Sequence, residues 1–351
     1  MRTRTRNFCV ALVALALFLG VEVSLRVLTN QDSKWNLRLG AGKIFDPVSH
    51  YRNKPNYAFE PGIVTNEHGF FAPPGVSFEN PPDALRLLYM GDSNSVMPCH
   101  AQFPALAESL LERRLGIEVV TINTAVPGYS SENARLLFLS EVFRYEADYF
   151  LVYLGWNDLS QFGPEGLSYK LHDSGYPIST FQRILSQIYS LRFLLAKIQL
   201  QQRKGPTADE PLIPEEESLY AGYTPTHFID NLSAILEKAQ TIYPRIYLMT
   251  LATLTSTQPT EEEMRRMHFP IGMGKNVRKL HRLVESYNAA VWQVARTYGV
   301  PVIDLYGFFD SPEARASFTD SCHMTRAGTR LIAEHIASEI ARREAEAPST
   351  R

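Results

Sequence analysis

Two short motifs, far apart in the chain, carry the side chains of a serine nucleophile and its base. Ser93 stands in Gly-Asp-Ser-Asn at residues 91–94, directly after an apolar run, and His323 ends Asp-Ser-Cys-His at residues 320–323. A serine hydroxyl is a poor nucleophile until a base takes its proton, and a third group must fix the tautomer of that base. His323 and Asp320 supply this pair from one loop, so we expect Ser93, His323 and Asp320 to act together.

Two positions that follow other apolar runs are candidates for stabilising negative charge. Gly128 lies in Val-Pro-Gly-Tyr at residues 126–129, and Asn157 lies in Gly-Trp-Asn-Asp at residues 155–158. Attack on a carbonyl creates an oxyanion, and the loss of one hydrogen-bond donor to it typically costs about 10²–10³ in rate. We expect the backbone N–H groups of Ser93 and Gly128 and the side-chain amide of Asn157 to form this oxyanion hole. Each also has a purely structural interpretation, as a helix cap, a turn glycine and an Asx turn.

Taken together, these motifs resemble the SGNH, or GDSL-type, hydrolases. The four blocks of that family match Ser93, Gly128, Asn157 and His323 in the same order, and Asp320 stands three positions before the histidine. The resemblance covers roughly residues 84–342. It implies a Ser-His-Asp esterase with a flavodoxin-like fold that uses neither a metal nor an organic cofactor.

Two further features are similar to the membrane-anchored bacterial branch of that family. Asn94 stands where many members carry leucine, and residues 65–71 look like an element found upstream of the nucleophile in anchored members. The resemblance implies cleavage of an O-acyl ester, with acetyl as the expected group, on an envelope or secreted carbohydrate. Two alternatives stay open. One is an O-acetyltransferase that passes the acyl group to a polysaccharide, and the other is a catalytically silent envelope binding or assembly module.

The order of apolar and helical patterns predicts an α/β fold. Five apolar runs alternate with helical patterns, as expected for βαβ units and a parallel sheet. The five runs therefore predict a five-stranded parallel sheet, and the resemblance implies that it is the centre of a flavodoxin-like three-layer α/β/α domain. Ligands of such sheets bind beyond the carboxyl ends of the strands, where Ser93, Gly128 and Asn157 all fall. The expected strands are residues 85–90, 117–122, 149–154, 246–251 and 300–305, and the expected helices are residues 103–115, 132–145, 226–242, 277–298 and 325–343.

Length and composition favour one main domain with appendages. The chain has 351 residues, of which 45% are hydrophobic, enough for a single large core. A net charge of −2 and the lack of a basic stripe argue against nucleic acid as a partner. The expected division is a membrane segment at 1–30, an extended connecting segment laid over the surface at 31–82, a hydrolase domain at 83–345 with insertions at about 160–225 and 255–280, and a polar tail at 346–351.

The amino terminus has the pattern of a membrane anchor. Three arginines within the first six residues precede an apolar run at residues 8–21, which continues to residue 28 with Glu22 and Arg26 on one helical face. No convincing cleavage site follows, so we expect an uncleaved anchor, with a cleaved signal peptide or a buried helix as alternatives. The positive-inside rule then sends the catalytic domain to the periplasmic side.

The cysteines raise the question of a disulfide. Cys99 lies six positions after Ser93, and Cys322 adjoins His323, so the two thiols come close if Ser93 and His323 meet. In an oxidising compartment such a pair could tie the nucleophile loop to the base loop. Two unrelated thiols are the alternative. No cysteine or histidine spacing resembles a zinc site.

Overall fold

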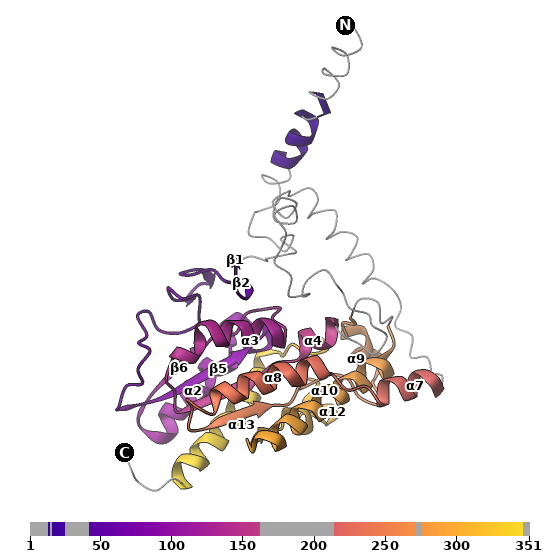
Figure 1. The fold of residues 1–351 in the computed structure, drawn as a ribbon. Coiled ribbons are helices and arrows are strands. Elements are labelled where there is room, and N and C mark those ends of the chain that lie inside the picture. Colours follow the sequence, from indigo (N-terminus) through magenta and orange to yellow (C-terminus); the bar gives the residue numbers. More distant parts are fainter. Residues whose placement is uncertain (1–12, 15, 25–41, 162–213, 271–274, 347–351) are drawn as a thin grey trace.

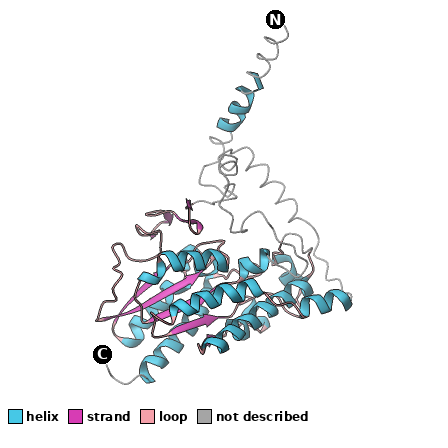
Figure 2. Cartoon of the chain, viewed as in Figure 1, coloured by secondary structure: helices cyan, strands magenta, loops and turns pink. Residues whose placement is uncertain are grey.

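The computed structural model describes residues 13–14, 16–24, 42–161, 214–270 and 275–346. A parallel sheet covered by helices on both faces forms the body of the molecule (Figures 1 and 2). Its strands are β5 (Ala84–Gly91), β6 (Glu118–Asn123), β7 (Tyr149–Tyr153), β8 (Ile246–Met249) and β9 (Val302–Ile303). They lie in the order β6-β5-β7-β8-β9, so the first strand of the sheet has a neighbour on each side.

The helices form the two outer layers. On one face α2 (Phe103–Leu115) contacts α13 (Arg326–Glu346), and on the other α3 (Ser131–Ser140), α8 (Thr226–Ala239) and α10 (Val277–Tyr298) pack side by side (Figure 1). This is the expected three-layer architecture. The shorter helices are α4 (Trp156–Gln161), α7 (Pro214–Ala221), α9 (Glu261–Arg266), α11 (Leu305–Phe308) and α12 (Pro312–Arg315), with 3-10 turns at Ser93–Ser95, Cys99–Ala101 and Val142–Arg144.

Burial and capping explain why these segments adopt their structures. Every residue of β5 and of β7 is buried, and a strand covered on both faces needs the largely apolar run that the sequence shows, interrupted in β5 by the buried Arg86. Helix α10 begins where the Asn276 side chain accepts the N–H groups of Arg278 and Lys279, and it ends at Gly299 in a left-handed conformation with φ of 64°. Both caps lie at the ends predicted for this helix.

All five predicted strands and five predicted helices are present, but several are shorter than expected. Strand β9 covers only Val302–Ile303 of the strand predicted at 300–305, because α11 already begins at Leu305, and α8 ends at Ala239 instead of residue 242. The expected helix at 132–145 is divided, because Glu141 leaves the helical conformation (φ −141°, ψ −51°) and a 3-10 turn follows α3. The predicted helix at 103–115 has the bounds of α2. The five-stranded parallel sheet of the predicted fold class is present.

The region expected to be a plain connector contains two antiparallel hairpins. Strand β1 (Lys43–Asp46) pairs with β2 (His50–Asn53), and β3 (Ala58–Glu60) pairs with β4 (Ile63–Val64). Phe71 then forms an antiparallel bridge with Asn123 at the edge of β6, and the neighbouring Phe70 is completely buried. This region therefore contributes to the core as well as to the surface.

No helix in the described parts of the chain is long and apolar enough to cross a membrane. Most of the expected anchor at 1–30 lies outside those parts, as do most of the first insertion at 160–225 and the tail beyond residue 346. The second insertion, at 255–280, is described except for residues 271–274.

The core between α3 and the sheet offers a test of the packing. Phe138 is fully buried and stacks on Phe150 with ring centroids 5.3 Å apart, whereas the adjacent Leu139 is 40% exposed. We expect Phe138→Ala to lower the free energy of unfolding by about 3–5 kcal/mol, because it removes a buried ring and leaves a cavity. Leu139→Ala should change it by less than about 0.5 kcal/mol. Denaturant unfolding measures both, and equal losses would contradict this packing.

Candidate active site

Ser93 lies at the sharp exit from the central strand. Strand β5 ends at Gly91, and the 3-10 turn Ser93–Ser95 begins two residues later, capped by Asp92, whose carboxylate accepts the N–H of Asn94 at 2.9 Å. A side chain at position 91 would not fit, because its Cβ would lie 2.3 Å from the Ser95 hydroxyl. The turn thus presents a half-buried Ser93 at the carboxyl edge of the sheet.

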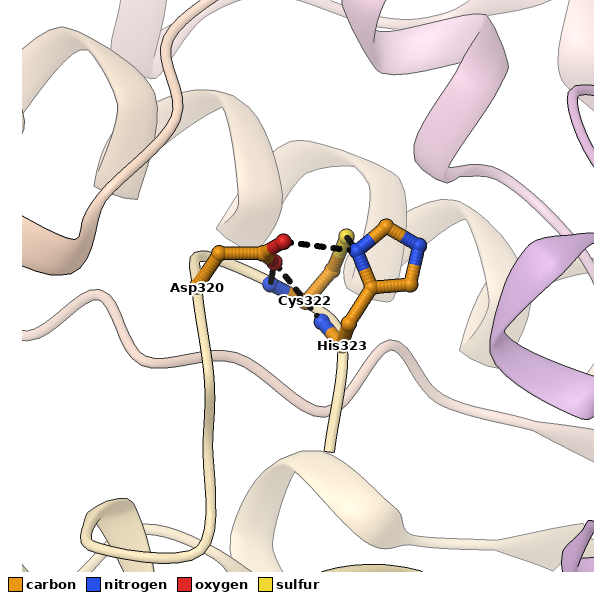
Figure 3. A group of neighbouring side chains, drawn as sticks. All are labelled: Asp320, Cys322 and His323. Atoms are coloured by element: carbon orange, nitrogen blue, oxygen red, sulfur yellow. Dashed lines mark hydrogen bonds and ion pairs between the residues drawn. The ribbon is translucent and has the colours of Figure 1, made fainter. Parts of the chain in front are cut away.

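The structure brings the three predicted catalytic side chains into one hydrogen-bonded chain. The Nε2 atom of His323 lies 2.9 Å from Ser93 Oγ, and its Nδ1 atom lies 2.8 Å from Asp320 Oδ2. Figure 3 shows the carboxylate facing the Nδ1 side of the ring while Nε2 points away from it. Because an ionised carboxylate only accepts, Nδ1 carries the proton and Nε2 is left to accept from the serine hydroxyl.

Asp320 is itself held by the backbone of its own loop. Its Oδ1 atom accepts the N–H groups of Cys322 and His323, each at 2.9 Å (Figure 3). Burial alone would raise the pKa of Asp320, but these bonds and the one from the His323 ring outweigh it and lower the pKa below its usual range. The carboxylate therefore stays ionised and keeps the ring in one orientation.

The pKa of His323 moves the other way. Burial alone would lower it, but the hydrogen bond to Asp320 and the negative charges of Asp320 and Asp92 outweigh burial and raise the pKa above its ordinary value. A raised pKa makes the imidazole a stronger base, and it also means that the ring is protonated, and unable to accept the serine proton, up to a higher pH.

Two of the three predicted oxyanion donors are available. The described residues offer no acceptor to the backbone N–H of Ser93 or of Gly128. The two loops are neighbours, because the N–H of Val126 donates to the Gly91 carbonyl at 3.3 Å. Asn157 differs, since its side-chain Nδ2 donates to Asp92 Oδ2 at 3.1 Å and to the Tyr129 carbonyl at 2.9 Å. Its amide can reach an oxyanion only by exchanging one of these bonds.

Two aspartates support the loops around the nucleophile. Asp92 shapes the turn and also contacts Asn157, and burial raises its pKa to about 6. Asp158 is fully buried and accepts the N–H and the hydroxyl of Ser131 at 2.8 and 2.5 Å, which joins the start of α4 to the start of α3.

Sequence reasoning missed Lys43. This half-buried lysine of β1 donates a hydrogen bond to the Pro127 carbonyl, and its Nζ lies 4.6 Å from the centre of the Tyr51 ring. Burial lowers the pKa of Lys43 to about 8. No signal in the sequence marks it, because it stands in a short strand outside every motif and far in sequence from the loop that it contacts.

The second insertion borders the base loop. His268 places Nδ1 3.5 Å from Asp320 Oδ2, although two thirds of its side chain is exposed, and its backbone N–H donates to Ser321 Oγ at 2.7 Å. A second histidine nearby in the sequence, His281 in α10, is buried and contacts Thr255 of the insertion. Among the histidines in the described parts of the chain, His323 is the one hydrogen-bonded to Ser93.

The possible disulfide between Cys99 and Cys322 is not formed, which corrects that pairing in favour of the alternative of two separate thiols. Cys99 and Cys322 are both free thiols. Cys99 packs in a small apolar cluster with Phe71, Val96 and Ala125, whereas Cys322 packs against the main core and turns its sulfur to His323 Nδ1 at 3.7 Å. The two thiols lie in different surroundings, although the loops that carry them are joined by the hydrogen bond between Ser93 and His323.

The base loop also brings together three groups that are able to hold a metal ion. The ligand atoms of Asp320, Cys322 and His323 lie within 4.8 Å of one another (Figure 3). Both ring nitrogens of His323 are already hydrogen-bonded, to Asp320 and Ser93, and burial raises the pKa of the Cys322 thiol well above its usual value. These contacts suit the cluster to proton transfer better than to metal binding.

Comparison with protein families identifies the domain. The model of the GDSL-like lipase/acylhydrolase family matches residues 89–331, which contain Ser93, Gly128, Asn157, Asp320 and His323. The chain belongs to this family. It is accordingly an SGNH-type esterase, as the motifs implied. No curated protein matches the chain.

Several solved structures are similar to this acylhydrolase. An acetylxylan esterase from Geobacillus stearothermophilus shares 14% identity over 73% of this chain and 94% of its own, with a TM-score of 0.44. A lipase/acylhydrolase from Enterococcus faecalis shares 16% identity over 74% and 96%, with a TM-score of 0.41. An alpha/beta hydrolase from the metagenome of Lake Arreo, Spain, shares 16% identity over 74% and 96%, with a TM-score of 0.44.

The raised pKa of His323 predicts the acid limb of the pH profile. Because the base must be neutral, kcat/KM for an activated ester should rise with a midpoint above the usual histidine value of about 6.5. Asp320→Asn removes the charge that raises this pKa, so the midpoint should move to lower pH while the rate falls by about 10⁴. Asp83→Asn, at an exposed position before β5, is the control. A limb that stays in place in Asp320→Asn would contradict this assignment.

Proposed function

We propose that this esterase removes an O-acetyl group from an envelope or secreted carbohydrate, with Ser93 as the nucleophile. One observation carries the catalytic part, namely the unbroken chain from Ser93 Oγ to His323 Nε2 at 2.9 Å and from His323 Nδ1 to Asp320 Oδ2 at 2.8 Å. These distances allow proton transfer without rearrangement of the loops.

The proposed reaction uses these three side chains in turn. Ser93 Oγ attacks the ester carbonyl while His323 Nε2 takes its proton, and Asp320 stabilises the imidazolium that results. The oxyanion is bound by the Ser93 and Gly128 N–H groups, joined by the Asn157 amide once it releases Asp92 or Tyr129. His323 returns the proton to the sugar oxygen, which leaves, and a water activated by the same ring releases the acyl group as acetate.

Two observations support the choice of substrate. The family is one of acylhydrolases, which accounts for the ester. The resemblance of Asn94 and of residues 65–71 to membrane-anchored members favours an acetylated carbohydrate of the cell envelope over a free lipid. Transfer of the acetyl group to a second sugar uses the same acyl-enzyme. Analysis of the reaction products therefore distinguishes water from a sugar as the acceptor.

We place the catalytic domain outside the cytoplasm, tethered by the uncleaved segment at 1–30. In the described part of that segment, apolar side chains of a helix stand exposed, among them Leu17, Leu19 and Val21 at 67%, 51% and 52%. Such a helix needs an apolar environment, and the arginines before it favour retention of its start in the cytoplasm.

This placement predicts the behaviour of a reporter. Alkaline phosphatase, which is active only after export, should be active in a bacterial host when fused after residue 351, and the fusion should sediment with membranes. Replacement of the three amino-terminal arginines by glutamate should reduce export, because the positive-inside signal is lost. An inactive, soluble wild-type fusion would overturn the placement.

The nucleophile is tested by covalent labelling. A fluorophosphonate should add one adduct to the full-length wild-type protein and none to Ser93→Ala, as measured by intact mass. Ser140→Ala, at an exposed position on α3, should be labelled like the wild type. A folded wild-type protein without an adduct would contradict the mechanism.

The substrate is tested with an acyl-length series and an acetylated polysaccharide. Activity on nitrophenyl esters should be highest for acetate and fall with chain length, and the polysaccharide should release free acetate. A preference for long chains would contradict the acetyl assignment. Acetylated sugar in place of acetate, when an oligosaccharide acceptor is added, would identify a transferase.

A further inference from the structure

The loop that carries the Gly128 N–H is a tight turn. Tyr129 N–H donates to the Val126 carbonyl at 3.1 Å, Pro127 occupies the second position, and Gly128 has φ of 87° at the third. These are the features of a type II β-turn, in which the Pro127–Gly128 peptide is the central one.

A turn of this kind has an alternative form in which the Gly128 N–H points to the opposite side. Type I and type II turns share their ends but differ in ψ of the second residue, about −30° against +120°, and in φ of the third, about −90° against +80°. The central peptide is thereby turned over, so its N–H and C=O exchange sides. Proline at the second position fits both forms, and glycine takes either sign of φ, so Pro127 and Gly128 do not themselves exclude the flipped form.

Lys43 holds the Pro127–Gly128 peptide in one of these two orientations. Its Nζ donates to the Pro127 carbonyl from the β1–β2 hairpin, and a Cβ at position 128 would lie 3.4 Å from Nζ and 3.0 Å from the Tyr51 hydroxyl. In a planar trans peptide, C=O and N–H point in opposite directions. The bond that holds the oxygen toward the hairpin therefore directs the Gly128 N–H away from it.

The hairpin is in turn fixed to the segments that flank the turn. Asn53 donates to the Ala125 carbonyl at 3.0 Å, the Tyr129 hydroxyl donates to Ser49 Oγ at 2.8 Å, and Asn133 donates to the Ser49 carbonyl at 3.2 Å. The hairpin precedes the family match, which begins at residue 89. Support of the turn thus comes from a part of the chain outside the domain that defines the family.

We propose that Lys43 is a positioning residue of the oxyanion hole, which keeps the Pro127–Gly128 peptide in the orientation that presents the Gly128 N–H to the reacting carbonyl. The inference rests on the proposed function of Ser93 and Gly128. Lys43 acts through the turn and does not touch the substrate.

The test compares Lys43→Met with Lys54→Met in the full-length chain. Lys54 is an exposed lysine just after the same hairpin, with Nζ 5.6 Å from the Tyr57 ring. Lys43→Met should lower kcat about 10- to 100-fold, within the cost of losing one oxyanion donor. KM for nitrophenyl acetate should not change, because the turn acts on the transition state, and the inhibition constant of methylboronic acid should rise by the same factor as kcat falls. Lys43→Arg, which keeps a donor, should recover most of the rate.

The end point of fluorophosphonate labelling gives the concentration of active sites, so kcat is expressed per folded site. Equal kcat and inhibition constants in Lys43→Met and Lys54→Met would overturn the inference, and so would a change confined to KM. Should Lys43→Met not fold, Lys43→Gln replaces it, because the glutamine side chain is one bond too short to reach the Pro127 carbonyl. Wild-type kcat in Lys43→Gln would likewise overturn the inference. A wild-type protein that is not labelled at Ser93 overturns both proposals, whereas normal labelling with an unaffected Lys43→Met overturns this one alone.

Discussion

The hydrogen bond between His323 Nε2 and Ser93 Oγ is the contact on which the rest of the site depends, since it joins residues 230 positions apart in the chain. A distance of 2.9 Å between such remote groups persists only if both ends are fixed. The nucleophile end is fixed by β5, in which every residue is buried. The base end is fixed at Ser321, whose carbonyl accepts the N–H of Leu254 at 3.0 Å and whose hydroxyl donates to the His268 carbonyl at 2.7 Å.

Strand order explains how the other predicted site residues come to the same place. Ser93, Gly128 and Asn157 follow β5, β6 and β7, which are adjacent in the sheet with β5 in the middle. Parallel strands end at one edge, so three loops distant in sequence emerge around the nucleophile. The outer loops also bond to the residues just before Ser93, through Val126 to Gly91 and through Asn157 to Asp92. The loops of the predicted oxyanion donors are thereby joined to the strand that carries Ser93.

The features predictable from the sequence are those whose physical cause is local. The strand at 149–154 was predictable because burial on both faces demands an apolar run, and the helix at 277–298 because its caps lie at its ends. The role of Lys43 was not predictable, because it depends on a hydrogen bond to a carbonyl 84 positions away. The pairing of Cys99 with Cys322 was wrong because closeness of two loops does not fix the direction in which their side chains point.

Two carboxylates beside one imidazole show how environment divides their roles. Asp320 accepts hydrogen bonds on both oxygens from its own loop and from His323, which lowers its pKa and keeps it charged. Asp92 is more deeply buried, and desolvation raises its pKa to about 6 even though it accepts from Asn94 and Asn157. Near neutral pH both charges act on His323 and favour its protonated form, as in the imidazolium created when the serine loses its proton. Asp320 can orient the ring because it touches Nδ1, whereas Asp92 acts on the ring only through its charge and accepts its hydrogen bonds from Asn94 and Asn157.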